Sequence, residues 1–210
     1  MNRFRRGLAV VLVTLLALAL YAFWFEPSRI RVVEHTVTNT DGSKIFTEAL
    51  RIAVIADLHA GAPFIGEAKI ERVVTLTNAA RPDLILLTGD YVIQGVVGGE
   101  HMAIERVAEK LRALSAPLGV YAVIGNHDRW ESDTHITSVL AKAGIAVLEN
   151  KSAEISRDTH TLRLVGLSDA FTTIPDIASA LSDVPDDAQA LCFTHSPDVF
   201  PDLPVAALSP

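Results

Sequence analysis

The sequence contains one cysteine, Cys192, among 210 residues. A single thiol excludes a disulfide within the chain, and it leaves the redox compartment open because a lone thiol is tolerated on either side of a membrane. Cys192 flanks a strand-like apolar run, which favours a packing role for its side chain.

The chain also lacks an excess of positive charge. Its 18 Lys and Arg residues are outnumbered by 25 Asp and Glu residues, which gives a formal net charge of -7 at neutral pH. A protein of this charge repels polyanions unless a local basic patch overcomes its field, and the sequence holds no such patch. Nucleic acid is therefore not expected as a partner.

Long apolar runs are few, and one of them lies at the N-terminus. Residues 7–25 carry no charge, and about 19 helical residues are enough to cross a hydrocarbon core of roughly 30 Å. This run predicts a transmembrane anchor. A cleaved signal peptide is the alternative, but such peptides usually end in small residues, whereas this run ends in Tyr21, Phe23, Trp24 and Phe25.

Charges on either side of the run predict its orientation. Arg3, Arg5 and Arg6 precede it, so the N-terminus is expected in the cytoplasm and the following domain on the outer face, although Arg29 and Arg31 weaken this asymmetry. We expect three regions: a cytoplasmic N-terminus and anchor (1–29), an edge strand from Ile30 to Thr40 with a connector (30–49), and the main domain (50–210).

From about Leu50 onward, short apolar runs alternate with helix-like stretches, which indicates an α/β sheet. The runs are rich in Val, Ile and Leu, as expected of strands buried on both faces. The predicted strands are 52–56, 84–87, 120–124, 153–156, 162–165 and 190–194, and the predicted helices are 70–78, 104–114 and 136–143. Strands 153–156 and 162–165 are expected to form a hairpin.

Polar side chains that can bind a metal follow four of these predicted strands. Ligands usually bind where the carboxyl ends of parallel strands converge, at one edge of the sheet. Oxygen and nitrogen ligands without a thiolate suit divalent ions such as Mn, Fe or Zn. The residues are Asp57 and His59 after the first strand, Asp90 after the second, Asn126, His127 and Asp128 after the third, and His195 after the last.

The local spacing supports this interpretation. In an extended segment alternate side chains point the same way, so Asp57 and His59 can reach one ion while Leu58 turns to the core. Gly89 and Gly125 each precede a candidate ligand, where a residue without Cβ allows a sharp turn and a close approach of the backbone.

The ordered motifs Asp57-x-His59, Gly89-Asp90 and Gly125-Asn126-His127-Asp128, followed by His195, resemble the calcineurin-like metallophosphoesterase family. The resemblance runs from about Leu50 to the end of the chain, and the anchor followed by residues 51–59 is similar to the bacterial membrane-associated branch. It implies a four-layer α/β/β/α sandwich preceded by one transmembrane helix. It also implies a bacterial inner-membrane location, with the catalytic domain on the extracytoplasmic side.

The resemblance further implies a role for each motif residue. Asp57 and His59 would bind one divalent ion, Asp90 would bridge two ions, and Asn126 and His195 would bind the second. His127 would stabilise developing charge or protonate the leaving alkoxide, and Asp128 would orient the His127 ring. The implied reaction is hydrolysis of a phosphomonoester or phosphodiester by metal-bound hydroxide, and the anchor favours a lipid-linked substrate.

After His195 this chain departs from the family's motif pattern. A final Gly-His-x-His segment does not occur before Pro210, so we expect a C-terminally incomplete sandwich and weak or no activity for this chain. The alternative is a noncatalytic, membrane-anchored scaffold or binding protein on the phosphoesterase fold.

Several residues lie outside the motifs. His35, His101, His135 and His160 are expected to face water, and the acidic group Asp183, Asp186 and Asp187 is expected to be a solvated face. Tyr91 and Trp130 are expected to be partly buried near loops, with stacking on a substrate as the alternative.

Overall fold

The computed structural model describes residues 3–37, 49–157, 160–185 and 187–203. The chain divides into two units, Met1–His35 and Thr36–Pro210, which are described separately below. The turn residues 158–159 of the expected hairpin lie outside the described residues, as does Asp186.

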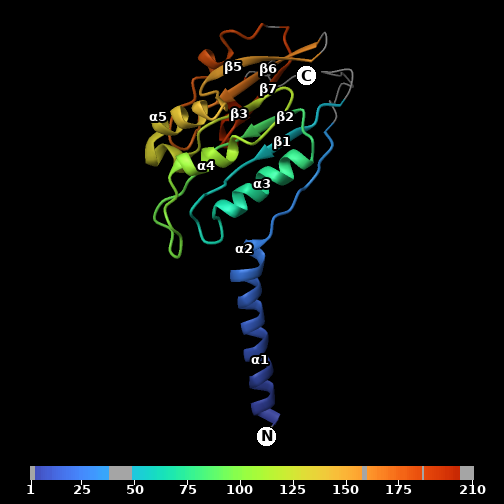
Figure 1. The fold of residues 1–210 in the computed structure, drawn as a ribbon, viewed down its shortest axis with the longest axis vertical. Helices are drawn as coiled ribbons and strands as arrows, with labels where there is room; N and C mark the ends of the chain where they lie inside the picture. The colour runs from blue at the N-terminus through green and yellow to red at the C-terminus, as the bar shows by residue number, and fades with distance from the viewer. Residues whose placement is uncertain (1–2, 38–48, 158–159, 186, 204–210) are drawn as a thin grey trace. The chain divides into compact units, whose positions relative to one another are not determined.

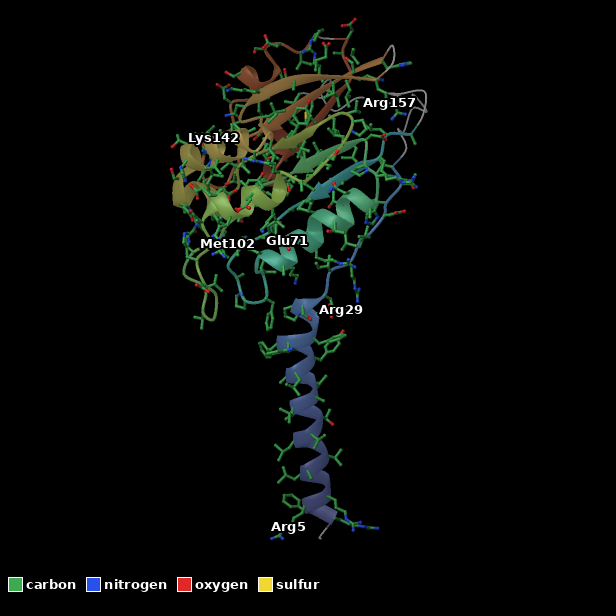
Figure 2. The ribbon with its side chains drawn as sticks, in the orientation of Figure 1. Arg5, Arg29, Glu71, Met102, Lys142 and Arg157 are labelled. Atoms are coloured by element: carbon green, nitrogen blue, oxygen red, sulfur yellow. The ribbon has the colours of Figure 1, made fainter. Side chains whose placement is uncertain are left out.

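The first unit is a single exposed helical rod. It consists of α1 (Arg3–Leu20), a short π-helical turn (Tyr21–Phe25) and α2 (Glu26–Ser28). Its side chains are exposed along its length, with Arg5 and Arg29 near its two ends (Figure 2). Among the described residues this one helix, Arg3–Ser28, has the length (26 residues) and apolar composition to cross a membrane.

The edge strand expected from Ile30 is not formed in the described residues 30–37, which have no regular secondary structure. Val32, Val33 and Val37 are exposed there. A β-branched run gains from strand formation only when it packs against a neighbouring strand, and residues 30–37 pair with no described strand. The remainder of that expected strand and its Asp41-Gly42 turn lie outside the described residues.

The second unit contains a four-stranded parallel sheet in the order β1-β2-β3-β4. The first three strands are each followed by a helix, and these helices cover one face of this sheet (Figure 1). The strands are β1 (Ile52–Ile55), β2 (Leu84–Leu87), β3 (Val120–Ala122) and β4 (Ala146–Val147), and the helices are α3 (Glu67–Ala79), α4 (Ile104–Leu111) and α5 (Asn126–Lys142).

A second, three-stranded sheet follows in the order β5-β6-β7. The strands β5 (Lys151–Arg157) and β6 (His160–Leu167) are antiparallel, as the expected hairpin requires. The strand β7 (Ala190–Thr194) pairs with β6 in parallel, which is possible because the helix α6 (Ile177–Leu181) and its flanking loops carry the chain back across the sheet. A 3₁₀ helix, Pro197–Asp202, ends the described chain.

Three hydrophobic clusters separate four layers. The alternation along β2 shows this directly: Ile85 and Leu87 pack toward the helices, whereas Leu84 and Leu86 pack between the two sheets. A third cluster lies between the second sheet, α6 and the 3₁₀ helix. The predicted α/β/β/α sandwich, preceded by one apolar helix, is confirmed.

The helix α5 differs most from its predicted bounds. It begins at Asn126 rather than Ile136 and contains a kink at Ser132, whose φ and ψ are 179° and 101°. Residues 126–135 lack the apolar periodicity that predicts a helix, so this first part is held by contacts to other loops. The two-residue strand β4 and the short helix α6 were not predicted from the sequence either.

Candidate metal centre

The ends of β1, β2 and β7 and the start of α5 bring the predicted metal ligands together. Two groups of side chains each place their ligand atoms within 4.8 Å of one another, and Asp90 belongs to both. The first group is His59, Asp90 and His127, and the second is Asp57, Asp90 and His195. Asp57 and His59 fall in different groups, but His59 Nε2 lies 4.0 Å from Asp57 Oδ1, so the two side chains are also neighbours.

The carboxylate of Asp90 lies between two imidazole rings. Its Oδ2 is 2.9 Å from His59 Nε2 and 3.6 Å from His195 Nε2. On the more open side, His59 Nε2 is 4.0 Å from Asp57 Oδ1, and the Asp57 side chain is 56% exposed. Asp90 itself is buried, so the site has a closed floor at Asp90 and an accessible side at Asp57.

The hydrogen bonds of His195 fit a role for its Nε2 as a metal ligand. Its Nδ1 is 2.9 Å from the carbonyl oxygen of Thr88, which can only accept, so Nδ1 carries a proton. In the neutral ring Nε2 then presents a lone pair, and it faces Asn126 Oδ1 at 3.1 Å and the Asp90 carboxylate. Lone pairs that converge in this way repel one another unless a metal ion or a second ring proton lies among them.

The fixed orientation of Asp90 comes from the N-terminus of α5. Asp90 Oδ1 accepts the backbone N–H of His127 at 2.9 Å, within the first turn of that helix. Helix N-termini carry unpaired N–H groups and a positive partial charge, so they hold a carboxylate well. One oxygen of Asp90 is therefore used by the helix and the other faces the imidazoles.

Three of the candidate ligands have a left-handed backbone. The φ angles are 51° at Asp57, 45° at His59 and 57° at Asp90. Such values are uncommon outside glycine, they cost free energy, and they cluster at functional sites where the surrounding structure imposes them. Leu58 between the first two is buried, as expected, so the sharp turns deliver both neighbouring side chains to the sheet edge.

The two glycines that precede candidate ligands allow the loops to touch. A Cβ on Gly125 would lie 2.2 Å from Asp90 Oδ1, and a Cβ on Gly89 would lie 2.5 Å from the Gly125 backbone nitrogen. Gly89 also has a φ of 99°. The predicted need for a residue without Cβ at both positions is confirmed.

Asp128 has a different position from the one expected. It is fully buried, and it accepts backbone N–H groups through both oxygens: Oδ2 from Asp90 (2.7 Å) and Gly125 (3.0 Å), and Oδ1 from Tyr91 (2.8 Å). These bonds point its carboxylate at the loop after β2 rather than at the His127 ring. Burial raises the pKa of the Asp128 carboxyl to about 6. Tyr91, expected to be partly buried, is also fully buried.

The ring of His127 adjoins the ligand group. Its centroid lies 5.1 Å from that of His59 and 4.7 Å from that of Trp130, and its Nδ1 is buried without a hydrogen-bond partner in the described part of the chain. A buried polar atom that lacks a protein partner is uncommon and favours a bound group nearby. Thr88, whose carbonyl orients His195, was not predicted as a site residue. Its position directly before Gly89-Asp90 is the sequence feature that could have indicated it.

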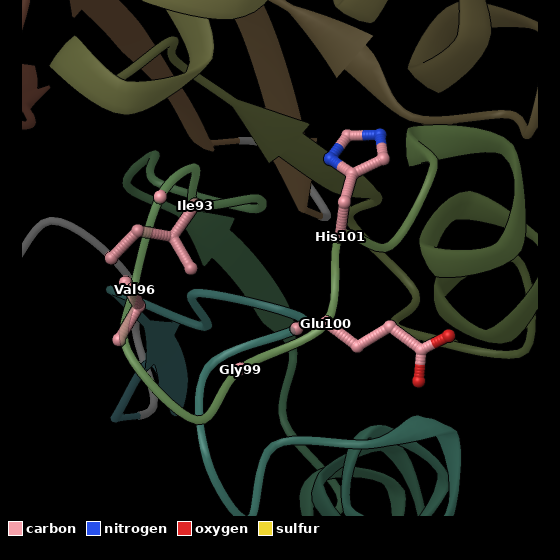
Figure 3. Close-up of a pocket in the computed structure, with 7 residues that line it drawn as sticks. Ile93, Val96, Gly99, Glu100 and His101 are labelled. Atoms are coloured by element: carbon pink, nitrogen blue, oxygen red, sulfur yellow. The ribbon is translucent and has the colours of Figure 1, made fainter.

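A small cavity lies beside the loops that follow β1 and β2. Its volume is about 100 Å³, and Figure 3 shows Ile93, Val96, Gly99, Glu100 and His101 around it. The candidate metal ligands do not line this cavity. The assignment of the site therefore rests on the convergent ligand atoms, which together supply carboxylate, amide and imidazole donors suited to divalent ions.

Comparisons with known proteins identify a family and several relatives. Residues 50–197 match the calcineurin-like phosphoesterase family. The metallophosphoesterase YkuE of Bacillus subtilis is 29% identical over 180 residues, which cover 85% of this chain and 61% of YkuE. A transmembrane protein with metallophosphoesterase domain from Danio rerio is 25% identical over 201 residues, covering 90% of this chain and 44% of that protein.

A third relative is named for its substrate. The UDP-2,3-diacylglucosamine pyrophosphatase LpxG of Chlamydia trachomatis is 27% identical over 246 residues, covering 91% of this chain and 71% of LpxG. The chain spans less than two thirds of YkuE and less than half of the Danio rerio protein. The family match covers most of the chain and includes every predicted metal ligand, so this chain belongs to the calcineurin-like phosphoesterase family.

Proposed function

We propose that this chain is a hydrolase of phosphate esters that holds two divalent ions, Mn, Fe or Zn, on Asp57, His59, Asp90, Asn126 and His195. The observation that carries the proposal is that Asp90 belongs to both groups of converging ligand atoms. Bound ions of this kind lower the pKa of a coordinated water toward neutrality and neutralise charge on phosphate oxygens.

The protein's own contribution begins with fixed geometry. Asp90 would hold both ions with a carboxylate that the α5 N-terminus already orients through the His127 N–H. Asp128 acts as a positioning residue, because it binds the Asp90 backbone and does not reach the substrate. Asp57, the most exposed of these ligands, lies on the side from which a substrate enters. Preorganised ligands of this kind need no rearrangement during the reaction.

His127 is the proposed catalytic residue. Its ring lies beside the His59 ring at the edge of the ligand group, where it can donate a hydrogen bond to a phosphate oxygen. It would stabilise the charge that develops there or protonate the departing alkoxide. General-acid catalysis of this type typically accelerates a reaction by about 10² to 10⁴ fold.

For the substrate we propose a phosphate mono- or diester linked to a membrane lipid. The candidate membrane span Arg3–Ser28 supports this, since tethering raises the local concentration of membrane-bound substrates. LpxG, a relative, is named for a diacylated sugar nucleotide. We further propose a single-pass anchor in a bacterial inner membrane, with the catalytic domain on the extracytoplasmic side.

The proposed activity is tested on the full chain in lipid nanodiscs. We expect about two transition-metal ions per chain by elemental analysis, and weak manganese-dependent cleavage of bis-p-nitrophenyl phosphate. Asp90→Asn should lose both, whereas Asp183→Asn, a matched change at an exposed acid, should keep both. Full metal binding by Asp90→Asn would contradict the proposed bridge. A wild-type chain without tightly held metal would favour the noncatalytic scaffold instead.

The proposed orientation has its own test. Protease added to intact spheroplasts should degrade the domain, and prior opening of the cytoplasmic side should make no difference. Degradation that occurs only after the cytoplasmic face is exposed would contradict an extracytoplasmic domain.

A further inference from the structure

Two exposed aromatic side chains continue outward from the candidate metal centre. The Trp130 ring lies 4.7 Å from the His127 ring, and the Phe171 ring lies 6.2 Å from Trp130. Trp130 is 58% exposed and Phe171 is 71% exposed. A contiguous apolar surface that begins at a catalytic group is typical of a binding site rather than of an ordinary solvated face.

The position of Phe171 is fixed although its ring is exposed. Asp169, which is fully buried, accepts hydrogen bonds from the backbone N–H of Phe171 (3.2 Å), the backbone N–H of Thr172 (3.0 Å) and the Thr172 hydroxyl (2.7 Å). A buried carboxylate with three donors holds this turn rigidly. The loop after β6 therefore presents Phe171 to Trp130 near the start of α5, and the surface joins this loop to the helix.

The loop after β6 carries a further exposed apolar side chain, and the geometry of the rings bears on what they can bind. Ile174, three residues after Phe171, is 90% exposed. Neighbouring rings meet edge to face, at 75° between His127 and Trp130 and 69° between Trp130 and Phe171. Such an arrangement offers no pair of parallel faces between which a nucleobase can stack. A flexible hydrocarbon chain, in contrast, can lie along ring edges and faces alike.

We propose that Trp130 and Phe171 form the binding surface for a hydrocarbon chain of the substrate, whose phosphate lies at His127 and Asp90. This inference rests on the proposed function and specifies its substrate class as lipid phosphate esters with the chain close to the phosphate. Burial of apolar surface on these rings supplies binding free energy that a short-chain ester lacks.

The chain has a built-in reporter for this surface. It contains two tryptophans, so Trp24→Phe leaves Trp130 as the only one. The full-length Trp24→Phe chain in nanodiscs with Zn²⁺ is titrated with methylphosphonate and hexylphosphonate, whose C–P bonds resist hydrolysis, and with thymidine monophosphate. Affinity and the emission maximum of Trp130 are measured for each probe.

We expect hexylphosphonate to bind about tenfold more tightly than methylphosphonate and to shift Trp130 emission to shorter wavelength. Phe171→Ala should abolish the preference and leave methylphosphonate affinity unchanged. Phe200→Ala, a partly exposed phenylalanine on the 3₁₀ helix, should retain the preference. Equal affinities for the two phosphonates, or a preference that survives Phe171→Ala, would overturn the proposal. Tighter binding of thymidine monophosphate than of hexylphosphonate would assign the surface to a nucleobase and overturn it too.

Failure of the proposed function gives a different result. In that case neither phosphonate binds in a metal-dependent manner, and Asp90→Asn changes nothing. Metal-dependent binding of both phosphonates with no preference for the longer chain refutes the hydrocarbon surface alone.

Discussion

Asp128 Oδ2 accepts the backbone N–H of Asp90 at 2.7 Å, so a buried carboxylate on α5 holds the main chain of the residue shared by both ligand groups. The same carboxylate accepts N–H groups from Gly125 and Tyr91. Through these bonds, Asp128 joins the loop after β2 to the start of α5. The geometry of the candidate metal centre therefore depends on a residue that does not face it.

Removal of this carboxylate should weaken both folding and metal binding. Asp128→Ala leaves several buried N–H groups without acceptors, and we expect it to lower the free energy of unfolding by about 3 kcal/mol. The measurement is urea unfolding followed by circular dichroism, together with metal content. Asp183→Ala, at an exposed acid, serves as the control and should change neither. A fully stable Asp128→Ala chain would mean that the loop has other means of support.

The contact between the loops can be tested at Gly125. Gly125→Ala would place a Cβ against Asp90 Oδ1, so the loop after β2 must move away from α5. We expect a loss of about 2 kcal/mol in stability and a clear loss of metal affinity. Gly66→Ala is the matched control, because nothing lies within 4 Å of its Cβ position. Normal metal binding by Gly125→Ala would show that the separation of the two loops does not matter.

The pair Arg129 and Glu149 should produce a pH-dependent stability. Burial raises the pKa of the Glu149 carboxyl, and the nearby Arg129 guanidinium opposes that rise. An acid whose pKa is higher in the folded state stabilises the fold most below its ordinary pKa, and this stability is lost as the pH rises through the folded value. Arg129→Met should raise the pKa of Glu149 further. The variant's free energy of unfolding should therefore fall below that of wild type by an amount that grows with pH and reaches about 2 kcal/mol near pH 8.

The double variant Arg129→Met with Glu149→Gln provides the control for this pair. It removes the partly buried charge together with its partner and should recover most of the stability and lose the pH dependence. A deficit in Arg129→Met that is the same at pH 5 and pH 8 would contradict the electrostatic explanation. Urea unfolding at a series of pH values measures both outcomes.

Cys192 should be a slow nucleophile in the folded protein. Burial raises the pKa of its thiol above the ordinary value of 9.0, so the thiolate fraction at neutral pH is smaller than for a free cysteine. The rate of iodoacetamide labelling, plotted against pH, should have its midpoint above pH 9 in the folded chain. In urea the midpoint should lie at a lower pH. Rapid labelling of the folded chain at pH 7 would contradict this.

The sequence predicts those parts of the site that follow strands directly. Asp57, His59, Asp90 and His195 each end an apolar run, so the rule that ligands gather at the carboxyl edge of a parallel sheet brings them together. The α/β sheet also follows from the order of apolar runs and helix-like stretches, whereas the four layers were implied by the family resemblance. These features depend on local patterns that one sequence displays.

Features that depend on contacts between distant segments were not predictable in this way. The first ten residues of α5 have no apolar periodicity, and their helix is set by carboxylates of Asp90 and of Asp128 at its N-terminus. The role of Asp128 required knowledge of which N–H groups lie beside it. Likewise, the proximity of Phe171 to Trp130 joins the loop after β6 to the helix α5, which no spacing along the chain reveals.

The left-handed backbone at His59 reverses the usual order of stability between alanine and glycine substitutions. Alanine normally stabilises a protein relative to glycine, but at a φ of 45° its Cβ is disfavoured by about 1 kcal/mol while glycine relaxes freely. Between two variants that both lack the imidazole, His59→Gly should therefore melt at a higher temperature than His59→Ala. The turn that aims this ring thus leaves a signature in heat stability that is independent of any bound ion.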